Sequence, residues 1–137
     1  MSGILVDANV ILDVFTEDPT WVDWSESRLH QYHATHVLYI NPIIYSEVSI
    51  GFERVEELES ALNRGGFQMQ QIPKEALFLA GKAFLTYRKR RGARTSPLPD
   101  FFIGAHAAVE GFDLLTRDTS RYKTYFPTVN LLSPDPT

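Results

Sequence analysis

Short apolar runs alternate along the chain with longer segments in which apolar residues recur at helical spacing. Residues 3–6 and 37–40 are apolar runs with the length and composition of buried parallel strands. Residues 67–72 alternate weakly, and residues 114–116 and 128–132 indicate two more short strands. The pattern predicts a mainly parallel sheet of about four to five strands.

Helical patterns fill the segments between these strands. Asp18-Pro19 and Asn41-Pro42 are helix-start signals, because proline suits the first helical turn. We predict helices over residues 7–14, 20–33, 41–50, 51–63, 73–91, 100–110 and 118–125. Strands that alternate with helices are typical of a parallel sheet covered by helices on both faces. No linker or internal repeat interrupts the pattern, so we expect residues 1–137 to form a single α/β domain.

Composition narrows the possible functions. The absence of cysteine excludes a disulfide scaffold, a zinc–thiolate site and a cysteine nucleophile. The formal net charge of -4 is not typical of a nucleic-acid-binding protein, which is usually basic. A local basic strip or a bound metal ion still leaves that function open. Neither a signal-peptide pattern nor a run of about 20 apolar residues is present, so we expect a cytoplasmic protein without a membrane segment.

Four acidic residues lie in apolar surroundings, where a carboxylate costs several kcal/mol unless it is paired or holds a cation. Asp7 ends the first apolar run. Asp118 follows the short run Leu114-Leu115-Thr116 near the carboxyl terminus. We place Glu47 and Asp100 in the early turns of two predicted helices. In open parallel sheets ligands collect at the carboxyl ends of the strands. We therefore expect all four carboxylates to border one crevice.

Each acid also has an ordinary structural explanation. Asp7 and Asp118 are good helix caps, Asp100 suits the start of a helix dipole, and Glu47 fits an exposed helical position. Four such residues in one crevice favour a divalent metal site instead. Oxygen ligands suit Mg²⁺ or Mn²⁺, and no histidine lies in any of the four motifs to favour zinc.

These motifs resemble those of the PIN domain and, within it, the VapC-type toxin ribonucleases of type II toxin–antitoxin systems. The resemblance is carried by Val6-Asp7-Ala8-Asn9, Ser46-Glu47, Leu98-Pro99-Asp100-Phe101-Phe102-Ile103-Gly104-Ala105 and Leu115-Thr116-Arg117-Asp118. It implies a three-layer α/β/α sandwich around a twisted sheet. It also implies a catalytic metal-binding quartet of Asp7, Glu47, Asp100 and Asp118, supported by Asn9 and Thr116.

The resemblance implies a metal-dependent endoribonuclease that hydrolyses RNA phosphodiester bonds with a metal-activated water, forms a homodimer and is inhibited by a small cognate antitoxin. Two alternatives within the fold are a catalytically inactive RNA- or protein-binding module and a nuclease acting on DNA. A phosphatase of the haloacid dehalogenase type is disfavoured, because it needs an Asp-x-Asp pair where this chain has Asp7-Ala8-Asn9.

Basic and aromatic residues supply weaker expectations. A basic cluster either forms a solvated helix end or contacts the RNA backbone, and comprises Arg88, Arg90, Arg91 and Arg94, with Arg117 and Arg121 further along. A second set of residues either lines a partner groove or dimer surface or belongs to the ordinary core, and comprises Trp21, Trp24, Leu29, Ile50, Phe52 and Val55. His106 is expected in the core or on the surface and not in the chemistry.

Overall fold

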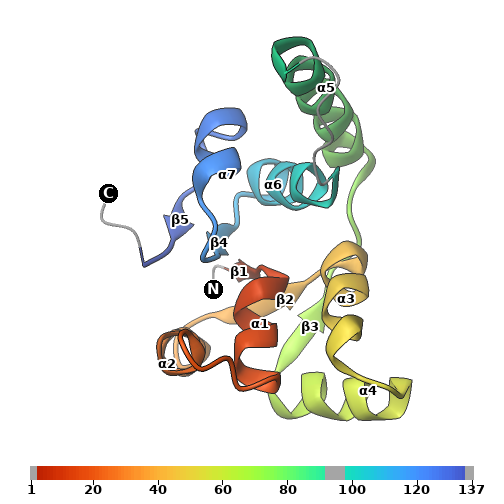
Figure 1. Cartoon of the computed structure of the whole chain (residues 1–137). Helices are drawn as coiled ribbons and strands as arrows, with labels where there is room; N and C mark the ends of the chain where they lie inside the picture. The colour runs from red at the N-terminus through yellow and green to blue at the C-terminus, as the bar shows by residue number, and fades with distance from the viewer. Residues whose placement is uncertain (1–2, 92–97, 135–137) are drawn as a thin grey trace.

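The computed structural model describes residues 3–91 and 98–134, apart from the side chain of Arg91 (Figure 1). The strands are β1 (Gly3–Val6), β2 (Val37–Ile40), β3 (Phe67–Met69), β4 (Asp113–Leu115) and β5 (Leu131–Leu132). The helices of the described residues are α1 (Ala8–Phe15), α2 (Val22–His33), α3 (Pro42–Val48), α4 (Val55–Arg64), α5 (Lys74–Arg91), α6 (Leu98–Glu110) and α7 (Ser120–Tyr125), with a 3₁₀ turn, η1, at Ser49–Gly51.

All five strands form one parallel sheet in the order β3-β2-β1-β4-β5. The chain therefore leaves β1 in one direction, through β2 to β3, and later returns to the other side of β1 through β4 to β5. Because parallel crossovers are right-handed, this reversal puts α1 to α4 on one side of the sheet and α5 to α7 on the other (Figure 1). The predicted three-layer α/β/α sandwich with a parallel sheet is confirmed.

The core lies between the central strand and the two helical layers. Ile4, Leu5 and Val6 of β1 are fully buried, as a central strand covered on both faces requires. On the α6 side, Phe101 meets the rings of several aromatic residues: Phe84, Tyr87, Tyr125 and Phe126. A Cβ on Gly104 would collide with the ring of Phe126. The glycine therefore allows α6 to pack closely, which fixes the position of its first turn.

Several predicted boundaries were wrong. Helix α3 ends at Val48, where the chain tightens into η1, so Glu47 lies in the last turn of its helix and not in an early one. Helix α4 begins at Val55 and not at Gly51, because the chain is extended at Phe52. The predicted strand over residues 67–72 stops at Met69, and the last strand, predicted over residues 128–132, is confined to Leu131–Leu132.

Helix α5 packs on α6 through a face that carries the buried Ala76, Ala80 and Tyr87, while Leu77 is 43% exposed. Helix α6, predicted to begin at residue 100, already includes Leu98 and Pro99, and residues 92–97 lie outside the described residues. No helix of residues 3–91 or 98–134 has the length and apolar character needed to cross a membrane.

Candidate active site

The four predicted acids line one pocket at the carboxyl end of the sheet. The pocket has a volume of about 210 Å³ and is lined by Asp7, Ala8, Asn9, Leu12, Glu47, Ile50, Asp100 and Asp118. The acids come from four separate segments, namely the end of β1, the end of α3, the start of α6 and the loop after β4. Since the strand order reverses at β1, this pocket lies at the topological switch point, where open α/β sheets bind ligands.

Asp7 both caps a helix and points into this pocket. Its backbone N–H continues the sheet by donating to Leu115 O at 2.9 Å, and the chain then turns into α1. Oδ1 of Asp7 accepts from the Ala8 N–H at 2.8 Å. Oδ2 accepts from the hydroxyls of Thr116 at 2.8 Å and Tyr122 at 3.0 Å. The Asp7 carboxylate therefore caps α1 and also lines the pocket.

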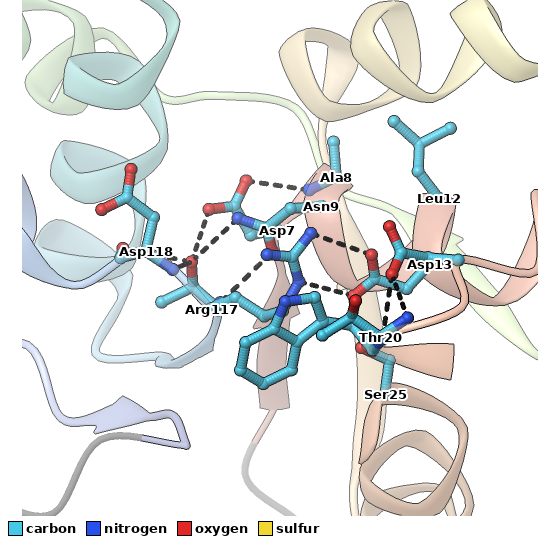
Figure 2. A network of polar contacts seen from close by, with 12 residues as sticks. Asp7, Ala8, Asn9, Leu12, Asp13, Thr20, Ser25, Arg117 and Asp118 are labelled. Atoms are coloured by element: carbon cyan, nitrogen blue, oxygen red, sulfur yellow. Dashed lines mark hydrogen bonds and ion pairs between the residues drawn. The ribbon is translucent and has the colours of Figure 1, made fainter. Parts of the chain in front are cut away.

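Thr116 is the centre of a small network that connects Asp7 to the loop after β4; Asp7, Asn9, Arg117 and Asp118 of this network are labelled in Figure 2. Its hydroxyl, which donates to Asp7, lies 3.4 Å from the donating amide nitrogen of Asn9 and 3.1 Å from the donating backbone N–H of Asp118. Oδ1 of Asn9 accepts from the backbone N–H of Arg117 at 3.3 Å. Thr116 and Asn9 thus hold the loop of Asp118 against Asp7, in the supporting positions that the sequence suggested. Asp118 itself is exposed.

A buried ion pair anchors the same loop from the other end of the network drawn in Figure 2. Asp13 of α1 is only 3% exposed and accepts from Arg117 Nε at 2.6 Å and Nη2 at 2.9 Å, and from Ser25 Oγ of α2 at 2.6 Å. The Arg117 guanidinium also lies 5.0 Å from the ring centre of Trp21. The sequence analysis missed Asp13, and it placed Arg117 at the RNA backbone, a role that stays a prediction.

Asp100 has a different partner. Its Oδ2 accepts from Arg121 Nη1 of α7 at 2.6 Å, and both side chains are partly exposed. The guanidinium also lies 5.6 Å from the ring centre of Tyr87 and 6.0 Å from that of Phe101. Arg121, predicted among the RNA contacts, is therefore an immediate neighbour of the acid pocket.

Glu47 is positioned by a link between its helix and α6. Asn41 is fully buried and caps α3, since its Oδ1 accepts from the Ile44 N–H at 2.9 Å. Its amide nitrogen lies 3.0 Å from Nδ1 of His106. An amide nitrogen can only donate, so Nδ1 accepts and the imidazole is neutral, in agreement with the lowering of the His106 pKa by burial. His106 is a core residue, as expected, and it ties the helix of Glu47 to the helix of Asp100.

Burial and mutual repulsion make the pocket unfavourable for negative charge. Burial, together with the charge of Asp100 and against the hydrogen bond from Thr116, raises the pKa of Asp7 to about 6. Burial, with the charges of Asp7 and Asp100, raises the pKa of Glu47 to about 7. Burial raises the pKa of Asp100 as well, although Arg121 opposes this. Such a pocket attracts protons or cations.

The donor chemistry fits a hard divalent cation. The acidic side chains offer oxygen ligands only, which suit Mg²⁺ or Mn²⁺, and a cation would relieve their repulsion. The side chains do not yet converge, however. Within the described residues no three acidic or histidine side chains form a ready cation site. One reason is visible in the geometry, because Asp100 is engaged by Arg121.

Of the remaining arginines predicted to contact RNA, Arg88, Arg90 and Arg91 belong to α5. Arg88 and Arg90 are exposed, and the Arg90 guanidinium lies 5.8 Å from the ring centre of Tyr125 on α7. The side chain of Arg91 and the whole of Arg94 fall outside the described residues. The expectation that these arginines contact RNA therefore stays a prediction.

Comparison with known proteins identifies the family. The sequence profile of the PIN domain matches residues 4–127 of the 137 residues. The chain therefore belongs to the PIN domain family, as the sequence motifs suggested. No curated protein matches the chain.

Several solved structures share the fold. One is a chain of VapBC2 from Rickettsia felis, bound to a DNA fragment from its promoter. It is 19% identical to this chain, the match covers 97% of this chain and 99% of the other, and the TM-score is 0.73. A chain of VapBC-1 from nontypeable Haemophilus influenzae is 18% identical over 96% of this chain and 97% of that one, with a TM-score of 0.68. VapC20 from Mycobacterium tuberculosis, a sarcin–ricin loop cleaving toxin, is 13% identical over 93% and 98%, with a TM-score of 0.61.

Proposed function

We propose that this protein is a metal-dependent endoribonuclease of the VapC toxin type. The observation that carries the proposal is the gathering of Asp7, Glu47, Asp100 and Asp118 around one pocket at the switch point of the sheet. A fold that only bound RNA or protein would have no need for carboxylates whose burial raises their pKa values. Membership in the PIN family and the likeness to VapC structures support the same conclusion.

The acids differ in exposure: Asp7 is buried, Glu47 and Asp100 are half-buried, and Asp118 is exposed. Asp7, Glu47 and Asp100 would hold Mg²⁺ or Mn²⁺, and the exposed Asp118 would contribute at the rim. When bound, such an ion supplies a water nucleophile near neutral pH and neutralises charge on the phosphate. Thr116 and Tyr122 orient Asp7 by donating to its Oδ2, and Asn9 holds Thr116. By family analogy the products carry a 5′-phosphate and a 3′-hydroxyl.

We infer that RNA is the substrate from the likeness to VapC20, a sarcin–ricin loop cleaving toxin, and from the motifs that resemble those of VapC-type ribonucleases. The pocket itself contains carboxylates, an amide and apolar side chains, a set that a phosphodiester of either sugar would satisfy. DNA therefore enters the test as the alternative substrate.

A cognate antitoxin is the proposed protein partner, because the VapBC structures that share the fold are toxin–antitoxin complexes. A mainly apolar groove of about 320 Å³ is open between the first helical layer and the edge strand β3. It is lined by Val14, Phe15, Glu26, Leu29, His30, His33, Leu38, Ala61, Arg64, Gly65 and Phe67. Of the apolar residues that the sequence suggested for such a groove, only Leu29 lies in it. We propose this groove for the antitoxin; the homodimer stays a prediction.

A short pulse of expression followed by sequencing of RNA 5′ ends tests the function and reports the target. Wild-type protein is expected to create new 5′ ends within minutes. The Asp7→Asn variant keeps a helix-capping oxygen but removes the charge, so it should fold and create none. Glu110→Gln, which removes an exposed acid at the other end of α6, should act as the wild type.

Labelled RNA and DNA strands, incubated with the purified protein and Mn²⁺ and then with chelator, decide the substrate class. Cleavage of RNA that stops with chelator supports the proposal. Cleavage of DNA alone would replace it with a DNA nuclease, and identical new RNA ends from Asp7→Asn would refute the role of the pocket.

A further inference from the structure

Helix α7 delivers two consecutive side chains to the acid pocket. Arg121 Nη1 donates to Asp100 Oδ2 at 2.6 Å, and the hydroxyl of Tyr122 donates to Asp7 Oδ2 at 3.0 Å. Tyr122 is 1% exposed, so its position follows from the packing of α7 on the core. One short helix therefore contacts both carboxylates, although Asp7 is also held by Ala8 and Thr116.

The Arg121 side chain is held in place and is not a freely moving surface arginine. Its side chain is 22% exposed, and that of Asp100 is 18% exposed. The guanidinium lies against the rings of Tyr87 and Phe101, at 5.6 Å and 6.0 Å from their centres. A cation beside aromatic faces gains a further attraction. The pair is therefore a built contact at the edge of the pocket.

We propose that Arg121 is the resident counter-cation of the acid pocket: it holds Asp100 in the metal-free protein and must release it before Asp100 binds a divalent cation. The inference rests on the proposed function, because it takes the pocket to be the metal site. The guanidinium now bonds one of the two oxygens through which Asp100 would bind a metal ion. A guanidinium and a metal ion held by the same carboxylate would also repel each other.

The other arginine near the site shows why Arg121 is the one that would move. Arg117 binds Asp13 through two nitrogens, Nε and Nη2, and Asp13 is almost fully buried. Arg121 reaches Asp100 through Nη1; the two arginines are about equally exposed, at 22% and 25%, but Asp100 is 18% exposed and Asp13 only 3%. Water replaces a lost partner more readily at Asp100 than at the nearly buried Asp13, which is held by two nitrogens. Arg117 therefore anchors the loop, whereas Arg121 competes for a ligand.

Competition for Asp100 predicts in which direction the loss of Arg121 changes the affinity for metal. If arginine and metal ion exclude each other at Asp100, removal of the guanidinium must tighten metal binding. If Arg121 helps to build the metal site instead, its removal must weaken metal binding. The two possibilities are separated by a binding measurement that needs no turnover.

The experiment is calorimetric titration of Mn²⁺ into the full-length protein at pH 8, where the carboxylates are ionised. Arg121→Gln and Arg121→Met both remove the charge, and the methionine keeps an apolar stem against the two rings. Each is expected to lower the Kd for Mn²⁺ about fivefold or more, the lower end of typical site–site coupling. Lys123→Gln removes an exposed cation of the same helix and should change the Kd less than about twofold.

Thermal unfolding gives a second readout. Mn²⁺ should raise the Tm of Arg121→Gln more than that of the wild type, because a tighter ligand stabilises the folded state more. An unchanged or raised Kd in the folded Arg121 variants overturns the inference and leaves the proposed function intact. A tightening of equal size in Lys123→Gln overturns it too, since general charge loss would then explain the result. Absence of Mn²⁺ binding by wild type and variants alike overturns both proposals.

Discussion

Replacing Arg117 by glutamine is expected to destabilise the protein by about 3 kcal/mol. The change leaves the Asp13 carboxylate, 3% exposed, without the two hydrogen bonds that Arg117 donates at 2.6 and 2.9 Å, and only Ser25 Oγ remains as its partner. Loss of one member of a buried ion pair typically costs about 3–5 kcal/mol. The Arg117 side chain is 25% exposed, so water partly replaces it and the lower end of that range applies.

Urea unfolding measures this loss, and the exposed pair of Arg54 and Glu56 provides the control. Both side chains of that pair are more than half exposed, at 69% and 67%, so Arg54→Gln should change the free energy of unfolding by less than about 0.5 kcal/mol. Because Arg117 also fixes the loop of Thr116 and Asp118, its replacement should weaken Mn²⁺ binding as well. Equal stability losses in the two variants would refute the argument that the Asp13 pair anchors the site.

Three further results are expected. The pKa values of Asp7 and Glu47 rise from 3.8 and 4.5 to about 6 and about 7 on folding, so the folded state binds more protons in this interval. The stability of the metal-free protein, measured by urea unfolding with chelator, should therefore fall as pH rises from about 4 to about 7. Glu47→Gln should make this fall smaller. A rise in stability over the same interval would contradict the burial argument. Mn²⁺ affinity should increase over pH 6 to 8, with proton release detectable from the buffer dependence of the binding heat; a flat profile would contradict it. Gly104→Ala should destabilise by about 1–3 kcal/mol through its clash with Phe126, whereas Gly81→Ala, in open space on α5, should stabilise by about 0.5–1 kcal/mol; similar Tm values for the two variants would refute the packing argument.

The sheet was largely predictable because its strands are short, apolar and buried on both faces. Val37–Ile40 was located to the residue, since β-branched and aromatic residues are followed there by Asn41-Pro42, which caps the next helix. Helix ends were harder to place. The end of α3 depends on the 3₁₀ turn at Ser49–Gly51, which packs against α1: a Cβ on Gly51 would come within 2.9 Å of Leu12. A contact of this kind between distant segments leaves no periodic signal.

The acids of the pocket were predictable, whereas their partners were not. Each acid stands out as a charged residue in an apolar run, which a sequence displays directly. Asp13 and Tyr122 are also functional neighbours, but they occupy ordinary positions in amphipathic helices. Arg117 and Arg121 were grouped with the RNA-contacting arginines as an extension of the basic cluster at residues 88–94. Only the fold shows that Arg117 pairs with Asp13, 104 positions away in the sequence, and that Arg121 pairs with Asp100, 21 positions away.

The most direct test of the central claim is the rate of single-turnover cleavage of a 5′-labelled RNA in Mn²⁺ by wild type, Asp7→Asn and Glu110→Gln. The pocket loses the charge of its most buried acid in Asp7→Asn, so the rate should fall at least about 100-fold, equivalent to about 2.7 kcal/mol. Glu110→Gln should cleave at the wild-type rate, and chelator should stop both. Wild-type cleavage that survives chelator, or an Asp7→Asn protein that is folded and cleaves as fast as the wild type, would contradict the account.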